Sequence, residues 1–202
     1  MNPGSPPTDN PASPRLQPRL PPGQVATDKW PVLHYGTVPE VDLSRWDLRV
    51  YGLVERPQTW TWQEFQSLPR VEVRSDIHCV TRWSRFDNLW EGVSLREVLR
   101  RAEVKPEARF AIIHAERGYT TNLPLSELDH DDVLLADKHD GKELAPEHGW
   151  PLRLVVPRRY FWKSAKWVRA LEISAQDRPG FWEQNGYHNE ADPWKEERFS
   201  AW

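Results

Sequence analysis

Short runs of alternating apolar and polar residues dominate the sequence from Trp30 onward. In residues 45–54, RWDLRVYGLV, the side chains of Trp46, Leu48 and Val50 fall on one face of an extended chain. A period of two is typical of a β-strand with one face covered by a core. Further strands are predicted at residues 71–79, 109–115, 118–125, 132–138, 152–157 and 166–174. Such a chain has to bury its short strands by pairing them into sheets.

Two short helices are predicted between the strands, at residues 61–68 and 94–102. Each begins with a hydroxyl residue followed by a glutamate three residues later, Thr61–Glu64 and Ser94–Glu97, the pattern of a capping box. The stretch at 80–92, VTRWSRFDNLWEG, breaks the alternation and is predicted to be a loop. Helices and strands do not alternate regularly. We therefore predict an α+β fold with mixed or largely antiparallel sheets and short helices.

The composition changes at the start of this region. Residues 1–29 are rich in Pro, Ser, Asn and Gly, and all twelve tryptophans of the 202-residue chain lie at or after Trp30. A segment with so few apolar residues has little to offset the entropy lost on ordering. We therefore predict a disordered N-terminal tail over residues 1–29 and one globular domain over residues 30–202.

Charge and hydropathy narrow the possible partners and location. The formal net charge is −3 and the pI is about 6.2, which argues against binding to nucleic acid or to an anionic membrane surface. No apolar run approaches the roughly 18–20 residues that a membrane span needs. The N-terminus has no basic patch followed by an apolar stretch, so no signal peptide is expected. The sequence thus predicts a soluble protein in a reducing cytoplasm.

The only cysteine, Cys79 in SDIHCVTRW, permits two interpretations. Its register with Val73 and Ile77 is that of an ordinary buried residue. However, the predicted strand ends there, and the nearby Arg82 and Arg85 favour a thiolate, which is a nucleophile or a soft metal ligand.

Two specific roles for a Cys79 thiolate, in a cysteine protease or in a zinc site, have little support in the sequence. A cysteine protease would need a histidine base, and His114 and His148 are candidates without a local signature. A zinc site formed by Cys79 and some of the histidines is possible, although the sequence has no H-x-x-x-H or C-x-x-C spacing.

A second informative stretch covers residues 147–173, EHGWPLRLVVPRRYFWKSAKWVRALEI. Its central strand is apolar at nearly every residue, which predicts burial on both faces. The basic and aromatic run after the strand is either a solvated connection or an anion site. In the second case the anion would be held by Arg153, Lys163, Lys166 and the Ser164 hydroxyl.

Three motifs together carry a family resemblance: HCVTRWS, HGWPLRLVVPRRYFWKSAKWVRALEI and GFWEQNGYHNEADPWKEERF. They resemble the molybdopterin-binding domain of the sulfite oxidase superfamily. The most similar branch is the short bacterial one related to the catalytic subunit of the periplasmic methionine-sulfoxide reductase. The resemblance covers about residues 30–202 and implies the sulfite-oxidase-type fold, with molybdenum-molybdopterin as the cofactor.

The resemblance also implies roles for individual residues. Cys79 would supply the protein thiolate to molybdenum, beside the two sulfurs of the pterin dithiolene. The phosphate of the cofactor would be held by Arg153, Ser164, Ala165 and Lys166. Contacts with the pterin are implied for His34, Tyr35, Gly36, His114 and His148.

The implied activity is two-electron oxygen-atom transfer on a small sulfur- or nitrogen-centred substrate, of the sulfite or sulfoxide type. An anionic substrate would be bound by Arg82, a catalytic candidate with Cys79, and by Arg158. Electrons would pass to or from a separate protein. Thr81 stands where the reductase has a carboxylate, so the substrate stays open.

Other features of the chain depart from its relatives. The periplasmic reductase has a twin-arginine signal, and animal and plant sulfite oxidases have a C-terminal dimerisation domain. Neither is expected in this chain. Two alternatives also remain at this point: a non-catalytic carrier of the cofactor, and an interaction domain in which Cys79 is inert.

Overall fold

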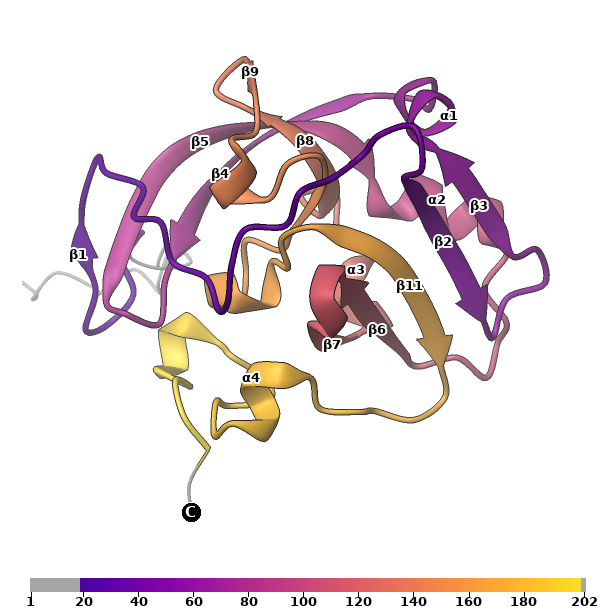
Figure 1. The fold of residues 1–202 in the computed structure, drawn as a ribbon. Coiled ribbons are helices and arrows are strands. Elements are labelled where there is room, and N and C mark those ends of the chain that lie inside the picture. The colour runs from indigo at the N-terminus through magenta and orange to yellow at the C-terminus, as the bar shows by residue number, and fades with distance from the viewer. Residues whose placement is uncertain (1–18, 201–202) are drawn as a thin grey trace, which may run out of the picture.

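The computed structural model describes residues 19–200, whose strands form two sheets (Figure 1). The first sheet has the order β1 (Val25–Ala26), β5 (Trp83–Ser94), β8 (Leu134–His139) and β10 (Arg153–Val155), with β4 (Val71–His78) on β5 and β9 (Lys142–Glu143) on β8. The second sheet has the order β3 (Gln58–Thr61), β2 (Asp47–Gly52), β11 (Val168–Ser174), β6 (Phe110–Ala115) and β7 (Thr120–Pro124). Only the pairs β1–β5 and β2–β11 are parallel within this described part. The predicted class, α+β with mixed and largely antiparallel sheets, is confirmed.

The helices are short, as predicted. They are α1 (Trp62–Gln66), α2 (Leu95–Ala102), α3 (Leu125–Leu128) and α4 (Phe181–Gln184), with 3-10 turns η1 (Glu116–Gly118), η2 (Pro146–His148), η3 (Phe161–Lys163) and η4 (Pro193–Lys195). The capping box of Thr61 and Glu64 is present. The second predicted box is wrong, because Ser94 makes no side-chain cap and Glu97 instead pairs with Arg100 and Arg101. Within residues 19–200, no helix has both the length and the apolar character to cross a bilayer.

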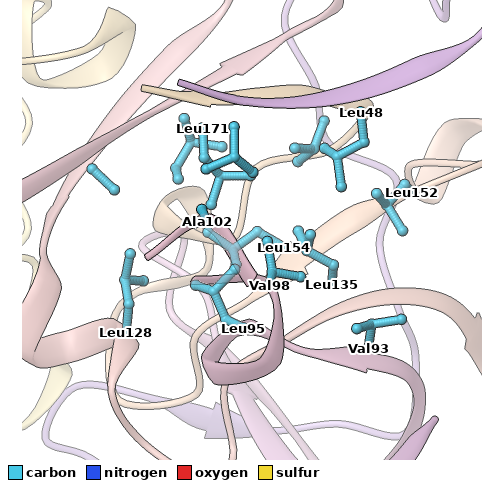
Figure 2. Close-up of a cluster of buried hydrophobic side chains, with 14 of the residues drawn as sticks. Leu48, Val93, Leu95, Val98, Ala102, Leu128, Leu135, Leu152, Leu154 and Leu171 are labelled. Atoms are coloured by element: carbon cyan, nitrogen blue, oxygen red, sulfur yellow. The ribbon is translucent and has the colours of Figure 1, made fainter. Parts of the chain in front are cut away.

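Helix α2 lies in the core between the two sheets. Figure 2 shows Leu95, Val98 and Ala102 of this helix among side chains from both sheets, including Leu48, Leu171, Val93, Leu135 and Leu154. All of these side chains are buried. Full burial of a leucine or valine contributes roughly 1.5–3 kcal/mol, so this layer supplies much of the force that joins the sheets.

The loop predicted at residues 80–92 is wrong, because β5 begins at Trp83 and only the residues before it form a turn. The alternation is hidden by buried polar residues in this strand. Ser84 and Asn88 are fully buried, and the Asn88 side chain donates to the carbonyl of Ser75 on β4 at 3.2 Å. A polar residue whose hydrogen bonds are satisfied can occupy a core position, and no apolar pattern marks it.

The predicted tail is wrong from Arg19 onward, while residues 1–18 lie outside the described residues. Strand β1 pairs with the start of β5, and Gln24 is buried. The Arg19 guanidinium pairs with the carboxylates of Asp76 and Asp87 at 2.8 and 2.6 Å. The segment is ordered by polar contacts with distant residues, so its low apolar content did not indicate disorder.

The arrangement brings both ends of the described chain to one region. In Figure 1 the segment between β1 and β2 crosses from one sheet to the other, and the C-terminal segment with α4 lies below the sheets. The C-terminal segment is ordered up to residue 200 and contains α4, η4 and a bridge between Tyr187 and Phe199.

Candidate active site

A cavity of about 440 Å³ opens where the end of β4, the segment after β1, the connection from β10 to β11 and helix α4 meet. It collects most of the residues predicted for the site. The predicted residues that line it are Cys79, His34, Tyr35, Gly36, Arg153, Ser164, Ala165 and Lys166. Five predicted residues are not part of its lining: Arg82, His114, His148, Arg158 and Lys163.

Cys79 lies directly after β4, in a turn that is closed by two backbone hydrogen bonds. The Cys79 N–H donates to the Trp83 carbonyl at 2.9 Å, and the Arg82 N–H donates to the Cys79 carbonyl at 3.0 Å. Arg82 has a φ of 72°, a value that non-glycine residues adopt infrequently and often near functional sites. The turn fixes the direction of the cysteine side chain into the cavity.

Cys79 is 8% exposed, and its sulfur lies 3.1 Å from the Thr81 hydroxyl. Burial raises the pKa of this thiol, while the interactions with Thr81 and the positive charges of Arg198 and Lys166 act in the opposite direction. A thiol that coordinates a metal ion loses its proton, because the ion replaces it as the positive charge on sulfur.

Two other interpretations of Cys79 lose support from the geometry. The neighbouring His78 does not act as a base for the sulfur, because its Nδ1 lies 2.8 Å from the Ser84 hydroxyl and its ring contacts Trp194 edge-on at 5.0 Å. Among residues 19–200, no group of three or more His, Cys, Asp and Glu side chains is placed to hold a metal ion. A metal on Cys79 would therefore take its other ligands from a cofactor or solvent.

Arg153 is a buried cation in the cavity wall, with 1% of its surface exposed. Its guanidinium donates to the carbonyl oxygens of His148 at 2.8 Å and Ser164 at 2.9 Å, and lies 4.2 Å from the Phe161 ring centre. Within the described residues no carboxylate pairs with it, and burial lowers its pKa to about 9. A buried charge without a counterion is costly, which makes this position suited to an anionic ligand.

Lys166 is a second cation in the same wall. Its Nζ donates to the carbonyl oxygens of Glu147 at 2.6 Å and Leu33 at 2.8 Å. Burial lowers its pKa to about 7, and the charge of Arg153 adds to this effect. Two cations of this kind beside each other attract a ligand with more than one negative charge.

Gly149 allows the turn after η2 to lie against both cations. Its φ is 114°, and a Cβ at this position would lie 3.1 Å from the Cβ of Arg153 and 3.2 Å from that of Lys166. Any side chain here would push the turn, with its carbonyl oxygens, away from the two basic residues. The glycine of the HGWPLRL stretch thus has a structural reason.

Ser164 lies in the wall of the cavity, whereas Lys163 does not. The Ser164 Oγ accepts a hydrogen bond from the Val156 N–H at 2.9 Å. The Lys163 ammonium instead points to the buried carboxylate of Glu183, 2.7 Å away, and donates to the Asn122 carbonyl. The prediction of Lys163 as an anion ligand is therefore wrong.

The structure does not bring His114 to the cavity. Its neighbour on β6, Ile113, points into the core, so His114 faces the opposite side of the second sheet. There its Nε2 lies 2.9 Å from a carboxylate oxygen of Glu172, and its ring stacks on Tyr51. The alternation of a strand thus removes the pterin contact that the resemblance implied for this residue.

Arg82, Arg158 and His148 also lie outside the lining. Arg82 contributes the backbone of the cysteine turn, and Arg158 pairs with Asp132 at 2.6 Å. The ring of His148 stacks on Trp30 with 3.8 Å between centres, and burial lowers its pKa to about 4. The His148 carbonyl oxygen accepts a hydrogen bond from Arg153, while the Nδ1 of its ring is buried without a hydrogen-bond partner among the described residues.

Aromatic side chains form most of the remaining wall. Trp83, Trp162 and Trp167 line the cavity, whereas Trp90, also near the motifs, is fully buried in the second hydrophobic cluster. Sequence reasoning missed several further lining residues: Trp30, Tyr119, Phe161, Phe181, Trp182 and Tyr187. The density of aromatic residues was visible in the sequence, but which of them face the cavity depends on the fold.

Two residues that hold the backbone of the cysteine turn were missed as well. The Gln24 side chain donates to the Cys79 carbonyl at 3.0 Å, and the Arg198 guanidinium donates to the Val80 carbonyl at 2.7 Å. Both side chains are buried, so the carbonyl groups of the cysteine turn are satisfied from opposite ends of the chain. No local pattern in the sequence marks such long-range contacts.

The donor set fits a cofactor that combines a soft metal, a phosphate and a flat ring system. One cysteine lines the cavity, the buried Arg153 and the half-buried Lys166 form no ion pair with a carboxylate among the described residues, and aromatic side chains supply flat walls. Thiolate sulfur suits soft metal centres, and arginine and lysine suit phosphate. The fold and the site together define a cofactor-dependent oxidoreductase.

The chain belongs to the family of the oxidoreductase molybdopterin-binding domain, which matches residues 35–182. It is 50% identical over 183 residues to the oxidoreductase YuiH of Bacillus subtilis, covering 90% of this chain and 92% of YuiH. It is 31% identical over 189 residues to the NADH nitrate reductase of Ulva prolifera, covering 78% of this chain and 21% of that protein.

A solved structure supports the same assignment. The sulfane dehydrogenase SoxCD of Paracoccus pantotrophus superposes with a TM-score of 0.67 at 26% identity, over 76% of this chain and 43% of that chain. The predicted sulfite-oxidase-type fold is thereby confirmed. The protein is a molybdenum-dependent oxidoreductase of the sulfite oxidase family, with molybdopterin as its cofactor.

Proposed function

We propose that this protein performs two-electron oxygen-atom transfer on a small sulfur- or nitrogen-centred substrate, with Cys79 as the protein ligand of molybdenum. The observation that carries this proposal is the Cys79 sulfur in one cavity with the buried Arg153 and the half-buried Lys166, neither of which forms an ion pair with a carboxylate among the described residues. When bound, the cofactor supplies a metal centre that exchanges an oxygen atom and two electrons with a substrate.

The residues of the chain bind and orient that cofactor. Cys79 would hold the metal from the closed turn after β4, while the Arg153 guanidinium, the Lys166 ammonium and the Ser164 hydroxyl would hold the phosphate. Ala165 would approach the same phosphate with its backbone. The segment with His34, Tyr35 and Gly36 would cover the pterin. These groups lie on different walls, so together they set both the position and the orientation of the cofactor.

The substrate would approach from the side of the cavity lined by α4. Tyr119, Phe181 and Trp182 line that side, where they exclude water and leave room for a small molecule. The proposed class includes sulfur-centred and nitrogen-centred substrates. The name of the sulfane dehydrogenase SoxCD supports the first kind, and the name of the nitrate reductase supports the second. A substrate of the sulfite or sulfoxide type is the specific choice that we propose.

Turnover also requires a source or acceptor of electrons. The chain has one cysteine, which is too few for an iron–sulfur cluster with four cysteine ligands. We therefore propose that a separate electron-transfer protein serves this enzyme. The cytoplasmic location that was expected from the sequence stays a prediction.

The test uses protein from a host that makes the cofactor. Under anaerobic conditions, a reduced viologen dye is oxidised by a functional enzyme when a sulfoxide is added. In the other direction, ferricyanide is reduced when sulfite is added. We expect one of these reactions in the wild type and none in Cys79→Ala. A protein that holds molybdenum but never changes its oxidation state with dyes or substrates would contradict the proposal and favour the carrier role.

A further inference from the structure

The side chain of Thr81 is directed at the Cys79 sulfur rather than at the protein around it. The Oγ1 of Thr81 lies 3.1 Å from the sulfur, and its backbone N–H also interacts with that sulfur. No other hydrogen bond within residues 19–200 holds this hydroxyl. Thr81 lines the cavity and is exposed at its edge.

The turn holds this pair in place. Its two backbone hydrogen bonds join Cys79 to Trp83 and to Arg82, at 2.9 and 3.0 Å. The side chains of Gln24 and Arg198 fix the carbonyl groups of Cys79 and its neighbour. Since both sides of the turn are held, the hydroxyl can leave the sulfur only by a rotation about the χ1 angle of Thr81. That angle is restricted in a β-branched residue.

The direction of the hydrogen bond follows from the chemistry of a metal ligand. In the free thiol either group can donate, but a thiolate bound to a metal has no proton. The Thr81 hydroxyl then has to be the donor and the sulfur the acceptor. A hydrogen bond to a ligand sulfur draws electron density from it and raises the reduction potential of the metal.

We infer that Thr81 tunes the molybdenum centre, by donating a hydrogen bond to the Cys79 sulfur that stabilises the reduced form of the metal. This inference rests on the proposed function, in which Cys79 is the metal ligand. Thr81 is thus a positioning and tuning residue, which acts on the metal through the cysteine.

The experiment compares Thr81→Val, which keeps the branched shape but lacks the hydroxyl, with Thr81→Ser, which keeps the hydroxyl. Each protein is purified from a host that makes the cofactor, and its molybdenum content is measured. The Mo(V) signal is then followed by electron paramagnetic resonance during a redox titration. We expect Thr81→Val to shift the equilibrium toward the oxidised form by about tenfold, which is about 59 mV toward lower potential for one electron. Thr81→Ser should keep the wild-type value.

The outcomes separate this inference from the proposed function. Full molybdenum in all three proteins, with equal potentials and equal sulfur-to-molybdenum absorption bands, would overturn the role of Thr81 alone. Equal potentials combined with a raised KM in Thr81→Val would overturn it too, since the hydroxyl would then act on the substrate. A wild type that is folded but free of molybdenum would overturn the proposed function and this inference together.

Discussion

The Arg198 guanidinium donates a hydrogen bond of 2.7 Å to the carbonyl oxygen of Val80, although the two residues lie 118 positions apart. The residue that follows the cysteine is therefore held by the C-terminal segment. Arg198 is 5% exposed and also stacks over the Tyr160 ring, at 4.9 Å from its centre. The ligand turn and the C-terminal segment thus form one structural unit.

Replacing Arg198 with methionine should loosen this unit. The Val80 carbonyl would lose its partner, which costs about 1–3 kcal/mol for a buried polar group. We expect this loss in the free energy of unfolding in urea, and faster alkylation of Cys79 in protein without cofactor. Arg158→Met is the matched control, because it breaks an exposed ion pair with Asp132 and should cost less than about 1 kcal/mol. Equal losses of unfolding free energy in both variants would contradict the role assigned to the hydrogen bond from Arg198 to Val80.

The glycine turn beside the two cations gives a second prediction. Gly149→Ala should reduce both stability and the amount of bound molybdopterin, because its Cβ would crowd Arg153 and Lys166. Gly141→Ala is a close control, since its φ of 74° is also positive but nothing lies within 4 Å of the new Cβ. Gly141→Ala should lower the free energy of unfolding by only roughly 1–2 kcal/mol, which is the cost of a non-glycine residue in the left-handed conformation. Thermal unfolding and pterin fluorescence measure the two effects, and similar pterin contents in both variants would argue against the role assigned to Gly149.

Lys166 predicts how the stability of the cofactor-free protein depends on pH. Its pKa falls from 10.5 to about 7 on folding, mainly through burial. Between these values the unfolded chain binds more protons than the folded one, so the free energy of unfolding rises with pH. The slope from this group is at most about 1.4 kcal/mol per pH unit.

Urea unfolding between pH 7 and pH 9 tests this prediction. The increase should be present in the cofactor-free wild type and much smaller in Lys166→Met. It should also shrink in the protein with bound cofactor, since a phosphate next to the ammonium restores the protonated form. An equal slope in the wild type and in Lys166→Met would show that another group is responsible.

The buried pair of Lys163 and Glu183 gives a prediction about stability alone. Their side chains are 1% and 2% exposed, and the carboxylate also accepts hydrogen bonds from Thr121 and Trp162. Lys163→Met would leave this carboxylate buried without its cation, at a cost of about 3–5 kcal/mol. The double variant with Glu183→Leu should recover part of that loss in urea unfolding. A loss below about 1 kcal/mol in the single variant would contradict the buried pairing.

The sequence predicted those parts of the molecule that depend on local pattern. The alternation of Trp46, Leu48 and Val50 located β2, and the pair Thr61–Glu64 located the start of α1. Strand β10 and its neighbours, residues 152–156, are buried as the apolar run indicated. In each case a pattern within about ten residues determines the structure, through strand periodicity, helix capping or burial.

The errors arise where distant residues decide. Residues 80–92 did not resemble a strand, because Asn88 is a polar residue whose partners lie on β4 and in its own strand. The segment after Arg19 is ordered by contacts with residues more than 50 positions away.

The same distinction holds for the site. Cys79, Arg153, Ser164 and Lys166 were recognised from the motifs and do lie in one cavity. Lys163 was assigned to the site because it lies in the basic run after the apolar strand, and His114 because the family resemblance implied a pterin contact for it. Their side chains, however, pair with carboxylates elsewhere, which only the arrangement of the strands reveals. Gln24 and Arg198 could not be found from local sequence for the same reason.

The most direct test of the central claim, that Cys79 ligates molybdenum, is the metal content and Mo(V) resonance of the wild type beside Cys79→Ser. Both proteins are purified from a host that makes the cofactor, and molybdenum is measured by elemental mass spectrometry. We predict nearly one molybdenum per wild-type chain. In the variant the resonance should be clearly altered or lost, since oxygen replaces a soft sulfur ligand. A well-folded wild type without molybdenum, or identical resonances in the two proteins, would contradict the claim.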